Sequence, residues 1–563
     1  MLPIIKSIRP FFRRFRFWIL AAVVSIGLVS FREANDNVFE LSRNLDIFTT
    51  LFRELTIYYV DPLDAESLVH QGIDAMLESL DPYTQYISED QAEDYRFMTT
   101  GEYGGIGALI GQRDNEVVIT DPYEGYPAQK GGLIAGDIIR SIDGKATKGK
   151  QYDEVSKMLK GQPKTAITLI VDRPGEAKPI TKTFLREAIQ IKNVPYYGVV
   201  NNNVGYIRLS SFTDNAGLEV KDAVVDLTQK KNVKGIIFDL RGNPGGLLNE
   251  AVNIVNVFVD KGQEVVSTRG KVKDWDKIYK ALNSATDTKT PVVVLVSSGS
   301  ASAAEIVSGS LQDFDRAVVI GQRTFGKGLV QTTRPLTYNT QLKVTTAKYY
   351  IPSGRCIQAL DYTHRNPDGS VGKVPDSLKR EFKTKVGRKV FDGGGIEPDY
   401  AMTPISYSTI TQIIANKYLL FDYATDYKIK HPVIAAAKDF HISDAEYSDF
   451  VKWLSNKDFE YVTESERKLE ELKDKATREH YFDAIKSDYD ALHMKLKHNK
   501  SEDLITHKEE IKSILENEIV SRYYYQNGRM ENSFLSDPEV KLAIRALQDP
   551  SVYNSILNRS FKE

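Results

Sequence analysis

Residues 291–310 read "PVVVLVSSGSASAAEIVSGS", and this stretch decides the fold class. The apolar run from Val292 to Leu295 is typical of a buried strand, and the small residues after it favour a tight turn that leads into a helix. Such a turn can present one side chain and several backbone N–H groups at a single point. Close packing of a helix would require the same small residues, so the rest of the chain must distinguish a functional serine from a packing one.

Strands and helices alternate on both sides of this stretch. The runs "VGYIRLSSF", "GIIFDLRG" and "RAVVIGQ" are strand-like, and the apolar spacing predicts helices at 217–229, 246–259 and 301–314. This β-α-β alternation predicts a layered α/β domain over residues 176–405.

The 563 residues are too many for one ordinary domain. Residues 38–98 have helical apolar spacing, and residues 99–175 alternate short strands with glycine-rich turns before one helix. After residue 406 the sequence is densely charged and helical, as in "TESERKLEELKDKATREHYF". The predicted fold class is therefore multidomain α/β plus α, with helical N- and C-terminal regions.

The first 37 residues form a basic segment followed by an apolar one. Five cations lie between Lys6 and Arg16, and residues 17–31 carry no charge. This pattern is typical of a secretory signal or an N-terminal anchor, with the basic flank in the cytoplasm and the remainder exported. No A-x-A site is visible, so cleaved and anchored forms both stay open. We expect a periplasmic protein, or one that is anchored in the inner membrane and faces the periplasm.

Composition excludes several classes of function. The net charge of −2 gives no reason to expect a nucleic-acid partner. Cys356 is the single cysteine, so no disulfide framework or cysteine-based zinc site can form, and no H-E-x-x-H motif is present. We predict no metal and no cofactor. None of the eight histidines lies between residues 71 and 363, so a Ser-His-Asp triad would need a histidine from a flanking region.

Lysine is the alternative base for a serine nucleophile. In "VVIGQRTFGKGLVQ", Lys327 lies between Gly326 and Gly328, and Gln331 follows at hydrogen-bonding reach. A lysine must be neutral to accept a proton, and burial among apolar groups favours that state. Residues 321–328 also resemble a P-loop, but Gly328 occupies the position where magnesium binding needs Ser or Thr.

The stretch "IIFDLRGNPGGLLNEAV" contains a further glycine-rich turn, at Gly245-Gly246. Backbone N–H groups at a strand-to-helix turn can hold an oxyanion. A glycine pair before a helix is also common in ordinary turns, so this feature alone does not define a site.

Together these stretches resemble the carboxyl-terminal processing proteases, serine peptidases with an embedded PDZ domain. The resemblance runs from about residue 40 to 402 and includes "LDPYTQYIS", "DLRGNPGGLL", "SSGSASAAEIVSGSLQD", "GQRTFGKGLVQ", "TTAKYYIPSGRCIQ" and "GGIEPD". It implies a PDZ domain at 99–175 and a serine peptidase core at 176–405. The chain departs from the family pattern at Ala304 and Cys356, where serine is frequent, and the helical region 406–563 lies outside the shared core.

The resemblance also implies the roles of individual residues. The nucleophile is Ser302, the general base is Lys327, and Gln331 positions the lysine. The oxyanion donors are the backbone amides of Gly246 and Ala303. The PDZ loop that binds the substrate carboxylate is Gly105, Ile106, Gly107 and Ala108.

The resemblance implies protein substrates with apolar C-termini, cleaved through an acyl-enzyme without a cofactor. It leaves open an adaptor protein, a homo-oligomer, and whether the PDZ domain activates or inhibits the site. Two other functions remain: an exported PDZ scaffold with an inactive α/β domain, and a crotonase-type enzyme with a similar oxyanion turn. Peptide hydrolysis distinguishes the first, and thioester turnover the second.

Overall fold

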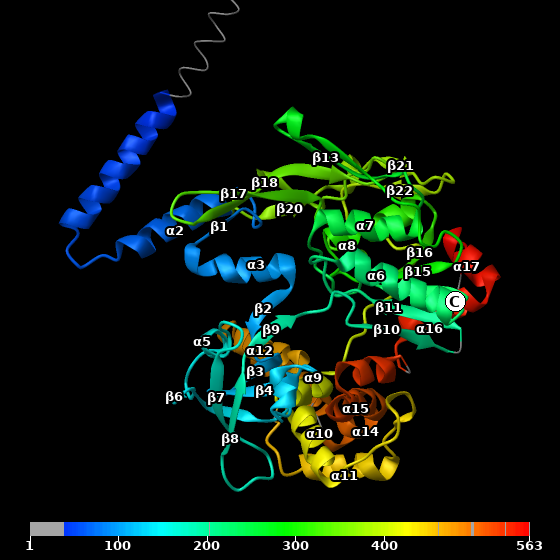
Figure 1. The fold of residues 1–563 in the computed structure, drawn as a ribbon. Helices are drawn as coiled ribbons and strands as arrows, with labels where there is room; N and C mark the ends of the chain where they lie inside the picture. The colour runs from blue at the N-terminus through cyan, green and yellow to red at the C-terminus, as the bar shows by residue number, and fades with distance from the viewer. Residues whose placement is uncertain (1–38, 202, 460, 497–499, 535, 562–563) are drawn as a thin grey trace, which may run out of the picture. The chain divides into compact units, whose positions relative to one another are not determined.

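The computed structural model describes residues 39–201, 203–459, 461–496, 500–534 and 536–561. The chain divides into two compact units, residues 1–86 and 87–563 (Figure 1). The signal or anchor predicted at residues 1–37 lies outside the described residues. None of the described helices has the length and apolar character needed to cross a membrane.

The first unit is helical where the sequence predicted helices. Residues 39–58 form one helix, and α2 (Ala65–Glu78) forms another. Asp64 caps α2, because its carboxylate accepts the N–H groups of Glu66 and Ser67 at 3.1 and 3.3 Å.

A six-stranded sheet forms the centre of the second unit. Its order is β10-β11-β12-β15-β16-β23, with β10 antiparallel to β11 and all other neighbours parallel. The strands are β10 (Tyr196–Val200), β11 (Val204–Arg208), β12 (Gly235–Asp239), β15 (Val292–Val296), β16 (Ala317–Gly321) and β23 (Tyr400–Ala401).

Helices cover both faces of this sheet, and apolar residues of the strands alternate between them. Ile236 and Phe238 pack with the helices of one face, whereas Ile237 packs with those of the other. The first face carries α6 (Ala216–Val225), α7 (Leu248–Phe258) and α8 (Ala303–Asp313), and the second carries α16 (Pro538–Gln548) and α17 (Pro550–Leu557). The layered α/β prediction is thus confirmed. Helix α7 begins two residues later than predicted, because Gly246 still forms a β-bridge with Phe212.

A smaller sheet with two helices forms a separate module of the second unit. The strand order is β3-β4-β5-β7-β8, so β3 is an edge strand. The elements are β3 (Ala108–Arg113), β4 (Glu116–Pro122), α4 (Pro127–Lys130), β5 (Ile138–Ile142), β6 (Lys145–Ala146), α5 (Tyr152–Leu159), β7 (Ala166–Asp172) and β8 (Ile180–Leu185). Before and after the module, β2 (Glu102–Gly105) pairs with β9 (Glu187–Gln190).

A second antiparallel sheet extends from the α/β core. It contains β13 (Glu264–Gly270), β14 (Lys277–Lys280), β17 (Leu329–Pro335) and β18 (Gln341–Tyr350). Helix α3 (Ala92–Thr100) contacts the β17–β18 hairpin through a hydrogen bond between Tyr95 and Thr333.

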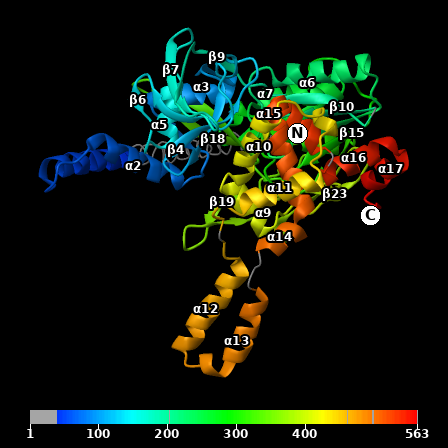
Figure 2. The ribbon, with the colours of Figure 1, turned by 90° about the horizontal axis from the view of Figure 1, so that it is seen from below.

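The C-terminal region is helical, as predicted. Its helices are α9 (Thr409–Asn416), α10 (Leu419–Lys430), α11 (Asp444–Leu454), α12 (Glu464–Arg478), α13 (Phe482–Leu496), α14 (Lys500–Thr506) and α15 (Lys508–Ser533). Helices α12 and α13 lie side by side as an antiparallel pair (Figure 2). Helices α9, α10, α11 and α15 share a hydrophobic core of their own.

Candidate active site

Ser302 lies directly before helix α8, at its N-cap position. Its backbone has φ 54° and ψ −114°, a conformation that is rare for a residue with a side chain. Such strain is maintained by surrounding structure and is frequent at functional positions. The predicted position of Ser302 at the start of a helix is confirmed.

The other serines of the stretch act in turns and packing, as expected. Ser297 Oγ accepts the Gly242 N–H at 2.9 Å, and Ser300 Oγ donates to the Leu240 carbonyl at 2.8 Å. Within α8, Ser308 and Ser310 donate to backbone carbonyls at 2.8 and 3.1 Å.

A buried carboxylate joins the Ser302 segment to the Lys327 segment. One oxygen of Glu305 accepts the N–H groups of Ser302 and Lys327 at 2.8 and 2.9 Å. The other accepts the Gly326 N–H at 2.8 Å and the Thr324 hydroxyl at 2.5 Å. Four hydrogen bonds from two loops therefore meet on one side chain with no exposed surface.

Burial dominates the ionisation of Glu305. Desolvation raises the pKa of its carboxyl from 4.5 to about 7, although the hydrogen bonds from Thr324 and from the Lys327 and Gly326 backbone act in the opposite direction. Burial therefore favours the protonated form of this carboxyl up to about neutral pH.

Tyr349 provides a second link between the same two segments. Its hydroxyl lies 2.6 Å from the Lys327 carbonyl and 3.1 Å from the Ser302 carbonyl, and its ring is buried. Glu305 thus holds the N–H groups of Ser302 and Lys327, and Tyr349 holds their carbonyl groups. The backbone geometry of the two residues is fixed relative to each other.

The glycine turn before α7 lies against the start of α8. A Cβ at Gly245 would lie 2.7–2.9 Å from atoms of Ala301, Ser302 and Ala303, so no larger residue fits there. The Gly245 N–H donates to Asn243 Oδ1 at 2.8 Å, which leaves the amide of Gly246 as the donor that this turn can offer. Ala303 is the first residue of α8, where a backbone N–H has no acceptor within the helix.

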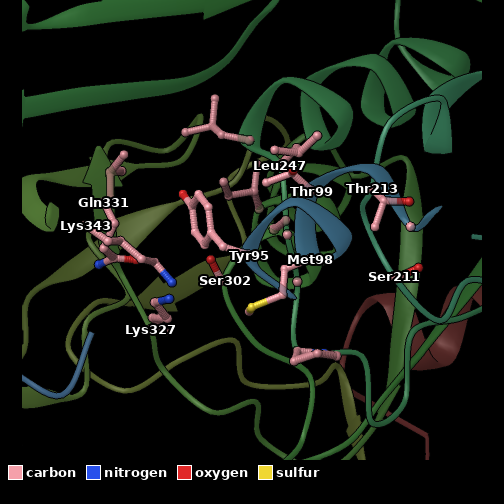
Figure 3. A pocket seen from close by; sticks show the side chains of 18 of the residues that line it. Tyr95, Met98, Thr99, Ser211, Thr213, Leu247, Ser302, Lys327, Gln331 and Lys343 are labelled. Carbon is pink, nitrogen blue, oxygen red and sulfur yellow. The ribbon is translucent and has the colours of Figure 1, made fainter. Parts of the chain in front are cut away.

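These residues surround one cavity of about 540 Å³ (Figure 3). Its lining includes Ser302, Lys327, Gln331 and Lys343, together with the two turn glycines and Ala303. Figure 3 shows the Ser302 hydroxyl and the Lys327 amine directed into this space. The described residues that line it include no histidine, aspartate or glutamate.

Gln331 is held on the β17–β18 hairpin. Its side-chain nitrogen donates to Thr345 Oγ1 at 3.1 Å, across the register pair that these two residues form. The amide is therefore anchored through its nitrogen. Its oxygen is the atom suited to accept a hydrogen bond from an ammonium group.

The predicted carboxylate-binding loop lies at the start of edge strand β3. Gly105 ends β2, Ile106 is buried, Gly107 has φ +69°, and Ala108 begins β3. A Cβ at Gly107 would lie 2.5 Å from Tyr126 Cβ, so this position requires glycine for both conformation and space. An unpaired strand edge beside a helix is the arrangement in which PDZ domains add a peptide strand.

A charge network fixes the end of β12 before the glycine turn. Arg241 contacts the buried Asp239 at 2.6 Å, and also Asp537 and Glu539 of the C-terminal region at 2.8 and 2.6 Å. Burial raises the pKa of Asp239, but Arg241 and Arg208 outweigh it and lower the value to about 2. The turn is therefore tied to helix α16.

Sequence reasoning missed three residues of this site: Glu305, Tyr349 and Lys343. Glu305 had a detectable signal, because Ser302-x-x-Glu305 has the spacing of a capping box. Tyr349 and Lys343 had none, because their positions depend on the register of the hairpin.

Three family models match the chain. "Peptidase family S41" matches residues 203–368, "PDZ domain" matches 118–173, and "Probable PDZ-protease, C-terminal helical domain" matches 410–547. The first contains the Ser302 and Lys327 segments, and the second covers most of the module that follows β3.

Curated relatives match over most of their length. The chain is 38% identical to a "Carboxy-terminal-processing protease" of Bartonella bacilliformis, over 62% of this chain and 81% of that protein. It is 32% identical to a "Probable CtpA-like serine protease" of Staphylococcus aureus, over 81% of this chain and 89% of that protein.

The solved structures that match the chain include a photosystem II D1 C-terminal processing protease, with 28% identity, a TM-score of 0.35, and coverage of 64% of this chain and 88% of that one. Another is the PDZ domain of a carboxy-terminal protease from Vibrio cholerae in complex with a peptide, with 27% identity, a TM-score of 0.15, and coverage of 16% and 99%.

Proposed function

The chain belongs to the carboxy-terminal-processing proteases, serine-type peptidases with a PDZ domain, and from this premise we propose that it cleaves exported proteins with a Ser302–Lys327 dyad. The observation that carries the proposal is that the same two side chains hold the Ser302 and Lys327 segments together. Glu305 and Tyr349 hold the backbones of both dyad residues, whose side chains are directed into one cavity.

The first step is attack by Ser302. The neutral Lys327 amine accepts the proton of the Ser302 hydroxyl as Oγ adds to the scissile carbonyl carbon. The side-chain oxygen of Gln331 then accepts a hydrogen bond from the resulting ammonium. No histidine lines the described part of the cavity, which favours lysine over a histidine borrowed from a flanking region.

The developing oxyanion is bound by the amides of Gly246 and Ala303. Lys327 returns its proton to the leaving amine, and the C–N bond breaks to leave an ester on Ser302. A water molecule, deprotonated by the same amine, then attacks the ester. The tetrahedral intermediate that forms then collapses. The new carboxylate is released, and Lys327 returns its proton to the Ser302 oxygen. These are the steps of a Ser-His-Asp triad, with lysine in place of histidine as the general base.

We further propose that the PDZ module selects substrates by their apolar C-termini. The substrate tail would add as a strand to the free edge of β3, with its terminal carboxylate at the amides of residues 105–108. Tyr152 N–H donates to Gln112 Oε1 at 3.0 Å, so the start of α5 lies beside this strand and provides the second wall of a groove.

Export is also a proposal. It is supported by the cations of residues 6–16 followed by the uncharged residues 17–31. A fusion of residues 1–37 to a reporter that is active only outside the cytoplasm tests it. An inactive but stably produced fusion would contradict export.

The test of the dyad is peptide hydrolysis by Ser302→Ala, Lys327→Ala and the double variant. We expect each single variant to lose proteolysis with the fold retained, and the double variant to be no worse than either, because the two residues act in one step. Substantial turnover by Lys327→Ala would exclude lysine as the base. A wild-type protein that binds but never cleaves would support the inactive-scaffold alternative.

A further inference from the structure

Lys343 is a second lysine in the active-site cavity. It lies on β18 and lines the same space as Ser302 and Lys327. Figure 3 shows its side chain beside that of Gln331. The mechanism above gives it no role.

The register of the hairpin explains this position. Lys343 pairs with Thr333, and Thr345 pairs with Gln331, so these four side chains share one face of the β17–β18 ribbon. Lys343 is the diagonal neighbour of Gln331, a separation of about 7–8 Å between such positions. This corresponds to about two residues of an extended peptide.

The described residues that line the cavity supply no counter-charge for Lys343. It is half-buried, and in the described part of the chain it forms no ion pair. Burial lowers the pKa of its ammonium group, with no carboxylate acting in the opposite direction. Removing an ammonium group from water without pairing it is unfavourable, so an unpaired cation facing a cavity is well suited to bind an anion.

We propose that Lys343 forms an anion subsite that binds a carboxylate of the substrate within about two or three residues of the scissile bond. The inference rests on the proposed peptidase function and extends it to substrate selection. A peptide can supply the carboxylate as an acidic side chain or as the α-carboxylate of a short C-terminal segment.

Two peptide series distinguish these sources. The first consists of amidated peptides with Glu or Gln at each of three positions on either side of the scissile bond. The second consists of neutral peptides that end, as free acid or amide, one to four residues beyond it. Each pair is compared by kcat/KM for the wild type, Lys343→Met, Lys343→Arg and the control Lys348→Met.

Met retains most of the apolar stem of lysine, and Arg retains the charge. Lys348 is exposed on the same strand and does not line the cavity, because its neighbour Tyr349 is the residue that is buried against it. We expect the carboxylate-to-neutral ratio at the responsive position to fall about 10- to 100-fold in Lys343→Met, as for a hydrogen bond to a charged group. Lys343→Arg should retain most of the ratio, and Lys348→Met all of it.

Equal ratios in wild type and Lys343→Met at every position would overturn the subsite. Loss of cleavage of neutral and acidic peptides to the same extent in Lys343→Met would also overturn it, because that result indicates a structural or chemical role. Fluorescence anisotropy with the Ser302→Ala protein measures the same charge preference without cleavage. A lack of cleavage by the wild type with the preference intact would therefore fault the peptidase proposal and not the subsite.

Discussion

Replacement of Glu305 by Gln tests whether one buried carboxylate controls both stability and the geometry of the dyad. The wild-type oxygens accept two hydrogen bonds each, whereas Gln has one oxygen and one NH₂ group. The less costly orientation keeps the oxygen on the Ser302 and Lys327 amides, and the Thr324 hydroxyl can turn to accept from the NH₂. The Gly326 N–H is then left facing a donor.

The magnitude follows from these contacts. A buried N–H without an acceptor costs about 1–3 kcal/mol, and Gly326 directly precedes the proposed base. A shift of that loop by about 1 Å is sufficient to lower turnover about 100-fold. We therefore expect kcat/KM for peptide hydrolysis to fall about 100-fold at pH 8.

The pH dependence of stability gives a second, independent measurement. The folded protein binds a proton at Glu305 up to about pH 7, but the unfolded chain only up to about pH 4.5. The stabilising contribution of this proton is complete below the unfolded value and is lost as the pH rises through the folded value. Between pH 5 and pH 8 the loss is about 2–3 kcal/mol, or about 5–10 °C in Tm for a domain of about 200 residues.

Calorimetry of wild type and Glu305→Gln from pH 5 to pH 8 measures this difference. The relevant transition is the one that a serine-directed inhibitor shifts, since binding stabilises the folded peptidase domain. The Tm advantage of the wild type should be largest at pH 5. Ser310→Ala, an uncharged change on the same helix, should give a curve parallel to the wild type. Parallel curves for Glu305→Gln, or activity within twofold of the wild type, would refute the reasoning.

Two further predictions concern the core and the PDZ loop. Asp313→Asn should lower the free energy of unfolding by about 3–5 kcal/mol, because it removes the charge that faces the buried Arg355 at 2.9 Å. Urea denaturation measures this loss. The double variant Asp313→Leu/Arg355→Met should recover the lost stability, because it removes both charges. Gly107→Ala should weaken binding of free-acid peptides to the Ser302→Ala protein, because its Cβ meets Tyr126 and its φ is +69°. An amidated C-terminus should weaken binding to the unmodified loop as well. Equal binding of acid and amide peptides would show that residues 105–108 do not bind the carboxylate.

The sequence predicted the central sheet and its helices because their apolar runs have clear periods. The apolar run 292–295 lies in the buried strand β15, and the helices expected at 217–229 and 301–314 correspond to α6 and α8. The site residues were predicted from motifs that the chain shares with a family. Neither kind of signal reports which strands pair.

The parts of the site that were missed depend on pairing and burial. The pairing of Lys343 with Thr333 places its side chain on the same face of the hairpin as Gln331. No local sequence pattern encodes that pairing. Tyr349 reaches two carbonyls 22 and 47 residues away in the chain. Glu305 could be expected to cap α8, but its bonds to the Lys327 loop arise from the tertiary fold.

The C-terminal helices could be interpreted from sequence only as charged, solvated surfaces, yet they complete the core. Val540, Ala543 and Leu547 of α16 cover the sheet face that contains Ile237 and Val293. Arg241 contacts Glu539 of this helix at the turn that precedes Gly245 and Gly246. The conformation of that turn therefore depends on residues about 300 positions away.

The same region also contacts β3, the strand to which we propose that a substrate tail adds. Arg113, on β3, donates to Asp422 of α10 at 2.7 and 2.8 Å, and Gln526 of α15 donates to Asp121 of β4 at 3.0 Å. Gly111 packs against the Tyr418 hydroxyl, since a Cβ there would lie 2.7 Å from it. Positions 111 and 113 share one face of β3, so the C-terminal helices support this strand through a sheet face and leave its backbone edge unpaired. A peptide that adds to β3 thus meets a strand already held by the helices that also complete the peptidase core.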